Sequence, residues 1–238
     1  MELIKQSDNS YSCKVMDMID YKGEIKSLKL QLHENMYFKA GQYINFILPN
    51  GESRPLSIAN SPNKDNLLEL HIKNVKDGEL SDYVFNQIKI DDPVHIDGPY
   101  GQTKFNYVES DALLFVCGGT GLAPVKSMIE YIFEHKNDEF KPIYLYWGVH
   151  SENELYMDSF LKSWAFKYKN FKYIPVVYKK HTNDLMVNKQ GNVHEVVLRD
   201  LDDLSGFDIY ICGPRNFIDV AKKDFKLRNV KDSQIFHD

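Results

Sequence analysis

The stretch Ala112–Pro124, which reads ALLFVCGGTGLAP, decides the fold of the second half of this 238-residue chain. An apolar run is followed by three glycines within four residues, and apolar residues then recur every three or four positions from Val125 to Phe133. This spacing predicts a strand, a tight turn and an amphipathic helix, with Pro124 suited to the first helical turn. Free N–H groups at such a helix start can bind a phosphate group, although a glycine-rich turn without a ligand fits the same pattern.

The glycine turn departs from the standard dinucleotide fingerprint. The third glycine of G-x-G-x-x-G would fall at Pro124, and no acidic residue stands about twenty positions further on. The turn therefore indicates a nucleotide site without specifying the usual ribose contact.

A second informative stretch, Arg54–Asn60, reads RPLSIAN. Its arginine precedes an apolar residue by two positions and a hydroxyl by three. A guanidinium can hold a phosphate through two parallel hydrogen bonds, and the extended backbone beside it can lie along a flat ring. The stretch favours a site for a planar, phosphorylated ligand, and a surface arginine ahead of a strand is the simpler alternative.

The periodicity of the apolar residues changes near residue 105. Before it, alternation predicts the strands of a small antiparallel β-barrel, with one helix that starts at Ser81 as its N-cap. After it, strands alternate with helices, which predicts an α/β domain with a parallel sheet covered on both faces. We expect a barrel domain over residues 1–103, an α/β domain over residues 108–238 and a linker over residues 102–110. The expected strands of the second domain are residues 112–117, 143–147, 173–178 and 207–212.

Composition narrows the class of protein. The formal net charge is −5 with both signs mixed along the chain, which speaks against a nucleic-acid partner. The sequence shows neither a signal-peptide core nor an apolar run of membrane-spanning length, so we expect a cytoplasmic protein. Three distant cysteines, Cys13, Cys117 and Cys212, argue against a disulfide framework and cannot supply the four thiolates of an iron–sulfur cluster. The histidines lack metal-ligand spacing, and we expect no metal site.

Six motifs, in the same order along the chain, resemble those of the ferredoxin-NADP reductase family, and most of all its stand-alone NAD(P)H-flavin reductases. The resemblance covers nearly the whole chain. It implies a flavin-binding barrel for FAD or FMN, an α/β domain for NADH or NADPH, and hydride transfer from the nicotinamide to the flavin. The motifs are FKAGQY (38–43), RPLS (54–57), GELS (78–81), DGPYG (97–101), YWG (146–148) and CGP (212–214).

The resemblance also implies roles for particular residues. Arg54 would hold a flavin phosphate or the ribityl chain, Ser57 would hydrogen-bond near the flavin N5, and Cys212 would border the nicotinamide. Ser57 and Cys212 are therefore the expected catalytic residues. The expected cofactor-binding residues are Arg54, Pro55, Leu56, Ser57, His71, Gly78 and Ser81 together with Gly118, Gly119, Thr120, Gly121, Gly213 and Pro214.

Three of these assignments have simpler alternatives. His71 alternates with apolar neighbours, so it faces away from the apolar side of its strand and can be an ordinary polar strand residue. Ser81 can be a helix cap without any ligand. Cys212 can likewise be a small buried residue at a strand end, but the following Gly213-Pro214 turn favours a role at the site.

Three functions fit these features. The first is a flavin reductase that supplies reduced flavin or electrons to other systems. The second is an electron-transfer component that docks on a partner oxygenase or dehydrogenase. The third is a non-catalytic flavin- or nucleotide-binding regulator, against which the intact Ser57 and Cys212 argue.

Departures from the family pattern lead to two further expectations. Leu56 stands where relatives usually carry Tyr or Phe, and the sequence stops at residue 238, short of a tail that often supplies an aromatic residue over the ring. Both features predict a loosely held flavin that acts as a substrate. His150 stands where relatives often carry an arginine, with Glu152 nearby, which predicts that NADH serves at least as well as NADPH. The alternative is that the pair at positions 179 and 180, both lysines, reaches the 2′-phosphate.

Overall fold

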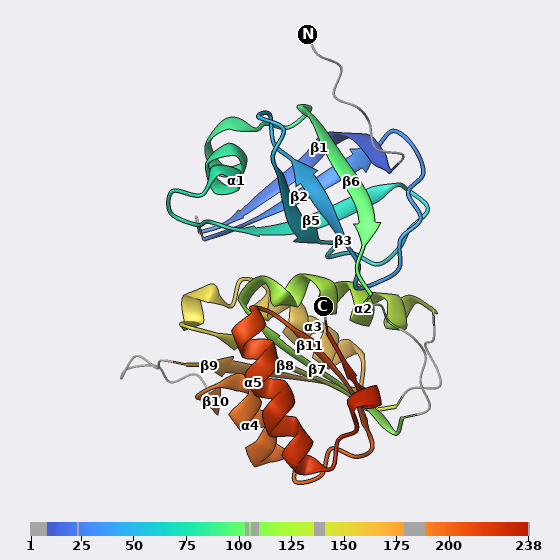
Figure 1. The fold of residues 1–238 in the computed structure, drawn as a ribbon, viewed down its shortest axis with the longest axis vertical. Helices are drawn as coiled ribbons and strands as arrows, with labels where there is room; N and C mark the ends of the chain where they lie inside the picture. Colours follow the sequence, from blue (N-terminus) through green and yellow to red (C-terminus); the bar gives the residue numbers. More distant parts are fainter. Residues whose placement is uncertain are drawn as a thin grey trace. The chain divides into compact units, whose positions relative to one another are not determined.

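The chain forms two compact units in a computed structural model that describes residues 9–22, 24–102, 105, 110–135, 141–178 and 189–237 (Figure 1). Unit 1 comprises Met1–Phe105 and Lys126–Tyr131, and unit 2 comprises Asn106–Val125 and Ile132–Asp238. A short piece of the helix that follows the glycine turn therefore groups with unit 1. The expected linker at residues 102–110 lies mostly outside the described residues.

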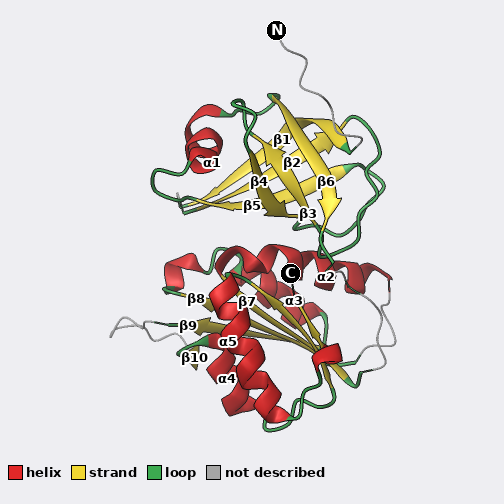
Figure 2. Cartoon of the chain, in the orientation of Figure 1, coloured by secondary structure: helices red, strands yellow, loops and turns green. Residues whose placement is uncertain are grey.

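Unit 1 is an antiparallel sheet of six strands in the order β4-β3-β6-β1-β2-β5 (Figure 2). A bridge between Ile58, just after β4, and Leu70 of β5 joins the two ends of this order, which closes the sheet as the predicted barrel. The strands are β1 (Ser10–Tyr21), β2 (Ile25–Leu32), β3 (Tyr43–Ile47), β4 (Ser53–Ser57), β5 (Leu67–Lys73) and β6 (Pro93–Tyr100).

The core of unit 1 follows the predicted alternation, since the apolar residues at every second position of β2, β3, β5 and β6 are buried. The sequence pattern missed β1, because a register shift between Val15 and Asp17 breaks the two-residue period within this strand. The predicted helix start at Ser81 is wrong. Helix α1 (Glu79–Asp82) has Gly78 as its N-cap and continues into the π-helical turn η1 (Tyr83–Gln87).

Unit 2 is a parallel sheet of six strands in the order β10-β9-β8-β7-β11-β12, with helices on both faces (Figure 2). The four predicted strands are present, and two strands of two residues each extend the edges. The strands are β7 (Ala112–Gly118), β8 (Ile143–Val149), β9 (Phe171–Val177), β10 (Lys189–Gln190), β11 (Phe207–Cys212) and β12 (Ile235–Phe236). The helices are α2 (Leu122–His135), α3 (Asp158–Lys167), α4 (Val193–Asp200) and α5 (Arg215–Phe225), with short 3₁₀ turns η2 (Gly119–Gly121), η3 (Glu152–Glu154), η4 (Lys226–Arg228) and η5 (Asp232–Gln234).

Both faces of this sheet are apolar because helices cover them. Leu114 and Val116 of β7 lie on the face that packs against α4 and α5. On the other face, Phe115 stacks on Tyr210 of β11 with ring centroids 5.0 Å apart. The continuous burial of β7, rather than alternation, is typical of a central parallel strand.

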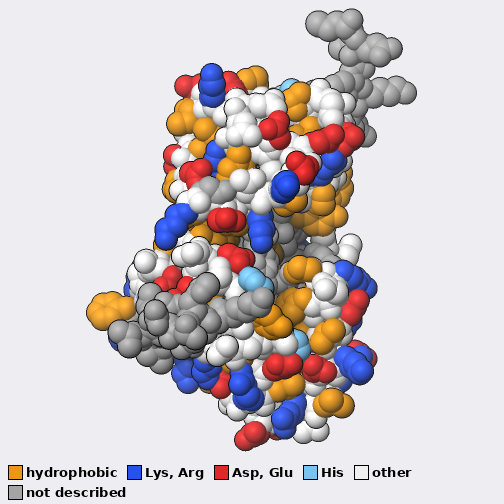
Figure 3. All heavy atoms as spheres, turned by 90° about the vertical axis from the view of Figure 1, so that its left-hand side faces the viewer, with side chains coloured by type: hydrophobic (Ala, Val, Ile, Leu, Met, Phe, Trp, Pro, Cys, Tyr) orange, Lys and Arg blue, Asp and Glu red, His pale blue; other side chains and the backbone are white. Residues whose placement is uncertain are grey.

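Charges of both signs are interspersed on the surface drawn in Figure 3. In the part of the chain that the structure describes, no helix is long and apolar enough to cross a membrane.

Candidate functional site

The strand order of unit 2 reverses between β7 and β11, and the predicted nucleotide residues gather there. From β7 the chain moves outward through β8 and β9, and later returns to place β11 on the other side of β7. Ligands of open α/β sheets bind beyond the carboxyl ends of the strands at such a switch point. The glycine turn follows β7, and Gly213 and Pro214 follow β11, so the structure brings these two segments together.

Contact between the two segments is so close that only glycine fits at one position. A Cβ on Gly121 would lie 2.3 Å from the Cys212 carbonyl oxygen and 3.0 Å from the Gly213 nitrogen. Gly213 itself has φ +155°, a conformation that side chains disfavour, and a Cβ there would lie 3.0 Å from the Phe217 ring. The glycine turn is therefore seated on the backbone of the predicted nicotinamide motif.

Trp147 supports the turn from the neighbouring strand. This fully buried residue of β8 donates a hydrogen bond from its indole Nε1 to the Gly119 carbonyl oxygen, 2.9 Å away. Its backbone pairs with Cys117, and the next pair along the two strands is Gly118 with Gly148. The YWG motif pointed to this strand, but the sequence did not reveal the indole contact.

Cys117 and Cys212 face each other across β7 and β11, and both are buried. Burial raises the pKa of Cys117 well above its ordinary value, and the nearby Cys212 adds to this effect. Cys117 is therefore a neutral packing residue. Cys212 lies at the last position of β11, beside the glycine turn, and its expected role at the nicotinamide stays a prediction.

The second predicted stretch forms β4 and the residues after it. Arg54 pairs with Phe46 of β3, and Ser57 pairs with Tyr43. Leu56 is half-buried and packs against the barrel core. Ser57 is half-buried, and its hydroxyl makes no hydrogen bond among the described residues; the same is true of Thr120 in the glycine turn. Each hydroxyl is thus available to a bound ligand.

Gly78 and Ser81 line a hollow of about 410 Å³ in unit 1. Ser81 is buried, and its hydroxyl accepts a hydrogen bond from the Val75 N–H (2.8 Å) and lies 3.2 Å from the Lys73 carbonyl oxygen, to which it donates. This hydroxyl fixes the turn before α1 instead of capping the helix. Its assignment to a flavin phosphate remains a prediction that these contacts do not favour.

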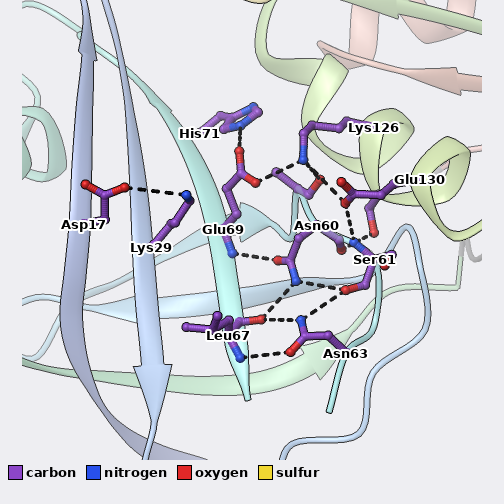
Figure 4. Close-up of polar contacts among 12 residues, drawn as sticks. Asp17, Lys29, Asn60, Ser61, Asn63, Leu67, Glu69, His71, Lys126 and Glu130 are labelled. Carbon is purple, nitrogen blue, oxygen red and sulfur yellow. Dashed lines mark hydrogen bonds and ion pairs between the residues drawn. The ribbon is translucent and has the colours of Figure 1, made fainter. Parts of the chain in front are cut away.

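His71 of β5 is buried in a charged cluster with Glu69 of the same strand and Lys126 of α2 (Figure 4). Its Nε2 lies 2.8 Å from Glu69 Oε1, and Glu69 Oε2 lies 3.0 Å from the Lys126 ammonium. Burial lowers the pKa of His71 more than the Glu69 carboxylate raises it. Burial alone would raise the pKa of Glu69, but the contacts with His71 and Lys126 outweigh this effect and lower it to about 2.

The cluster holds the segment that follows Ser57. Lys126 donates to the Ala59 carbonyl oxygen at 3.2 Å, and the Ser127 hydroxyl donates to the Asn60 carbonyl oxygen at 2.7 Å. The Glu130 carboxylate accepts the Ser61 N–H at 2.8 Å. Figure 4 shows the Lys126 and Glu130 side chains reaching this segment from α2. Residues of α2, which the sequence assigned only to the nucleotide motif, therefore position the end of the RPLSIAN stretch.

Asn60 completes this arrangement from within the stretch. Its side chain donates to the carbonyl oxygens of Ser61 and Leu67, both at 2.9 Å, and accepts the Glu69 N–H at 2.7 Å. An asparagine between two strands was the only sequence signal for this role, since such residues often bond to nearby backbone. Asn60 fixes the turn that connects β4 to β5.

The residues expected to select the nicotinamide nucleotide are described only in part. His150 is exposed after β8, and its ring stacks at 5.8 Å on Tyr178. The pair at positions 179 and 180 lies outside the described residues.

Comparison with known proteins identifies both halves of the chain. The protein-family model of the oxidoreductase FAD-binding domain matches residues 12–105, and the family model of the oxidoreductase NAD-binding domain matches residues 115–223. The CDP-6-deoxy-L-threo-D-glycero-4-hexulose-3-dehydrase reductase of Yersinia pseudotuberculosis is 37% identical over 240 residues, covering 100% of this chain and 70% of the relative. A probable flavin reductase of Photobacterium leiognathi is 38% identical over 215 residues, covering 89% of this chain and 90% of the relative. Among solved structures, a cytochrome P450 reductase of Amycolatopsis has a TM-score of 0.88 and 25% identity, covering 96% of this chain and 68% of that one.

Proposed function

This chain belongs to the ferredoxin-NADP reductase family of oxidoreductases, and on that premise we propose that it is an NAD(P)H-flavin oxidoreductase that reduces FAD, FMN or riboflavin with a hydride from NADH or NADPH. The observation that carries the proposal is the junction at the switch point of unit 2. There the glycine turn rests on Cys212 and Gly213, in a chain whose other domain is of the FAD-binding type. The reduced flavin, or electrons from it, would serve other systems.

The proposed roles follow from the groups available at each site. Backbone N–H groups of the glycine turn and the start of α2 bind the nucleotide pyrophosphate, with the Thr120 hydroxyl as a further donor. Cys212, held in place by the turn, borders the nicotinamide. In unit 1 the Arg54 guanidinium holds a flavin phosphate. The Ser57 hydroxyl, which has no partner among the described residues, hydrogen-bonds at the edge of the flavin ring.

The proposal is tested by following the oxidation of NADH, and separately of NADPH, by the purified protein with riboflavin, FMN and FAD in turn. We expect oxidation only when a flavin is present. Failure to oxidise either NADH or NADPH with any of the three flavins would refute the proposal and leave the non-catalytic regulator as the better interpretation.

An electron-transfer component is the second candidate, because the Yersinia relative is named as the reductase of a dehydrase. Flavin retention distinguishes the two roles. We expect a loosely held flavin, since Leu56 packs partly against the barrel core and an aromatic pair's extra ~0.5–1.5 kcal/mol is absent. Gel filtration after addition of FAD, read at the flavin absorbance, measures retention. Stoichiometric flavin after the column would favour the component that keeps its flavin and docks on a partner protein.

A further inference from the structure

Two carboxylates already bind the guanidinium that would hold a flavin phosphate. Arg54 Nη2 donates to Glu79 Oε2 at 2.9 Å and to Glu52 Oε2, while Nη1 donates to the Ser53 carbonyl oxygen at 3.0 Å. A phosphate that takes up the fork of Arg54 must therefore displace carboxylate oxygens from it.

Glu79 occupies a different position from Glu52. It is the first residue of α1 and lines the hollow of about 410 Å³ together with Gly78, whereas Glu52 does not line it. Asp77 and Asp82 also line this hollow, against one cation, Lys76. Hydrogen bonds from Asn86 and Gln87 lower the pKa of Asp82, so its carboxyl group stays ionised.

The consequence depends on the charge of the ligand. A flavin phosphate that binds Arg54 competes with Glu79 and then lies beside its carboxylate, and like charges at such distances repel. Riboflavin has no phosphate and avoids both costs. We propose that Glu79 is a specificity-determining residue that disfavours FMN and FAD relative to riboflavin by competing for Arg54, an inference that rests on the proposed flavin reductase function.

The expected size of the effect follows from exposure. The Arg54 and Glu79 side chains are 37% and 53% exposed, so water screens the pair. We expect Glu79→Gln to tighten FMN binding by about three- to tenfold, because one surface ion pair and one nearby repulsion are removed.

The test measures the dissociation constants of riboflavin and FMN by quenching of flavin fluorescence, without NADH. The ratio of the riboflavin dissociation constant to the FMN dissociation constant is compared between wild type, Glu79→Gln and Asp77→Asn. Asp77→Asn is the matched control, since it removes the same charge from the same hollow at a residue whose positive φ suits asparagine. We expect the ratio to rise about three- to tenfold in Glu79→Gln and less than about twofold in Asp77→Asn.

A double-variant cycle checks that Arg54 mediates the effect. In an Arg54→Ala background, Glu79→Gln should leave the ratio unchanged. Equal shifts for both flavins, an equal effect of Asp77→Asn, or an effect that persists without Arg54 would each overturn the inference. Fluorescence reports binding rather than turnover, so binding without NADH oxidation would refute only the proposed function. Absence of quenching by every flavin would refute both proposals.

Discussion

Replacing Gly121 by Ala tests the junction between the glycine turn and the proposed nicotinamide motif at Cys212 and Gly213. The new Cβ would lie 2.3 Å from the Cys212 carbonyl oxygen and 2.7 Å from its carbon, both backbone atoms that cannot rotate away. An ordinary contact needs roughly 1 Å more, so the turn and the end of β11 must move apart by about that amount. Overpacking of this kind typically costs about 1–3 kcal/mol, which lowers the melting temperature by about 2–12 °C for a chain of this size. A displacement of about 1 Å can also cost about 100-fold in turnover, and we expect that loss in kcat/KM for NADH.

Gly118→Ala is the control for stability within the same turn. Gly118 has φ −118°, and its added Cβ would meet nothing closer than 3.9 Å. Thermal unfolding of both variants, followed by circular dichroism, should show a lowered melting temperature for Gly121→Ala alone. A Gly121→Ala protein with wild-type melting temperature and wild-type KM for NADH would refute the reasoning, because the contact would then be absent in solution.

Three other predictions concern chemistry, nucleotide choice and pH. Replacement of Ser57 or Cys212 by Ala should lower the hydride-transfer rate more than it weakens ligand binding, and stopped-flow reduction with deuterated NADH measures this; unchanged single-turnover rates would remove both residues from the mechanism. NADH should serve at least as well as NADPH, because His150 is a poorer phosphate clamp than arginine, and a clear NADPH preference in kcat/KM would contradict this. Acid should destabilise the flavin-free protein in two steps. Because the pKa of His71 is lowered by folding, the unfolded chain binds more protons than the folded chain below pH 6.5, and stability falls as the pH drops from there. The stabilising contribution of Glu69 is present above pH 4.5 and is lost between pH 4.5 and about 2. His71→Gln should flatten the fall in melting temperature as the pH drops below 6.5, and an unchanged slope would show that His71 does not titrate in this way.

The two-domain architecture was predictable because its signals are local. Strands β2, β3, β5 and β6 bury every second residue on one side, and the glycine turn stands between a buried strand and an amphipathic helix. β1 escaped prediction, since its bulge shifts the inward-facing residues by one position after Val15. The residue type of Ser81 predicts a helix cap, but its hydroxyl forms hydrogen bonds with the backbone of Val75 and Lys73 instead.

Residues that support the site were harder to predict, because their partners are distant in sequence. His71 lies on the side of β5 that alternation marks as polar, yet its side chain has 0% exposure. Glu69 and Lys126, 57 positions apart, complete the cluster around it. No periodicity in either segment indicates this contact, since neither residue is apolar. The polar side of β5 is therefore a second packed surface.

The position of Lys126 also affects how future variants should be interpreted. The residue follows the glycine turn by only five positions and reads in the sequence as part of the nucleotide motif. Its ammonium nevertheless contacts the Ala59 carbonyl oxygen and Glu69, and its side chain is 4% exposed. Removing this charge would leave Glu69 buried beside neutral His71, a situation that commonly costs about 3–5 kcal/mol. A loss of activity in Lys126→Met would therefore reflect displacement of the segment that follows Ser57 rather than a lost nucleotide contact. We therefore expect the KM for flavin to rise in Lys126→Met and the KM for NADH to stay unchanged when the two substrates are varied separately.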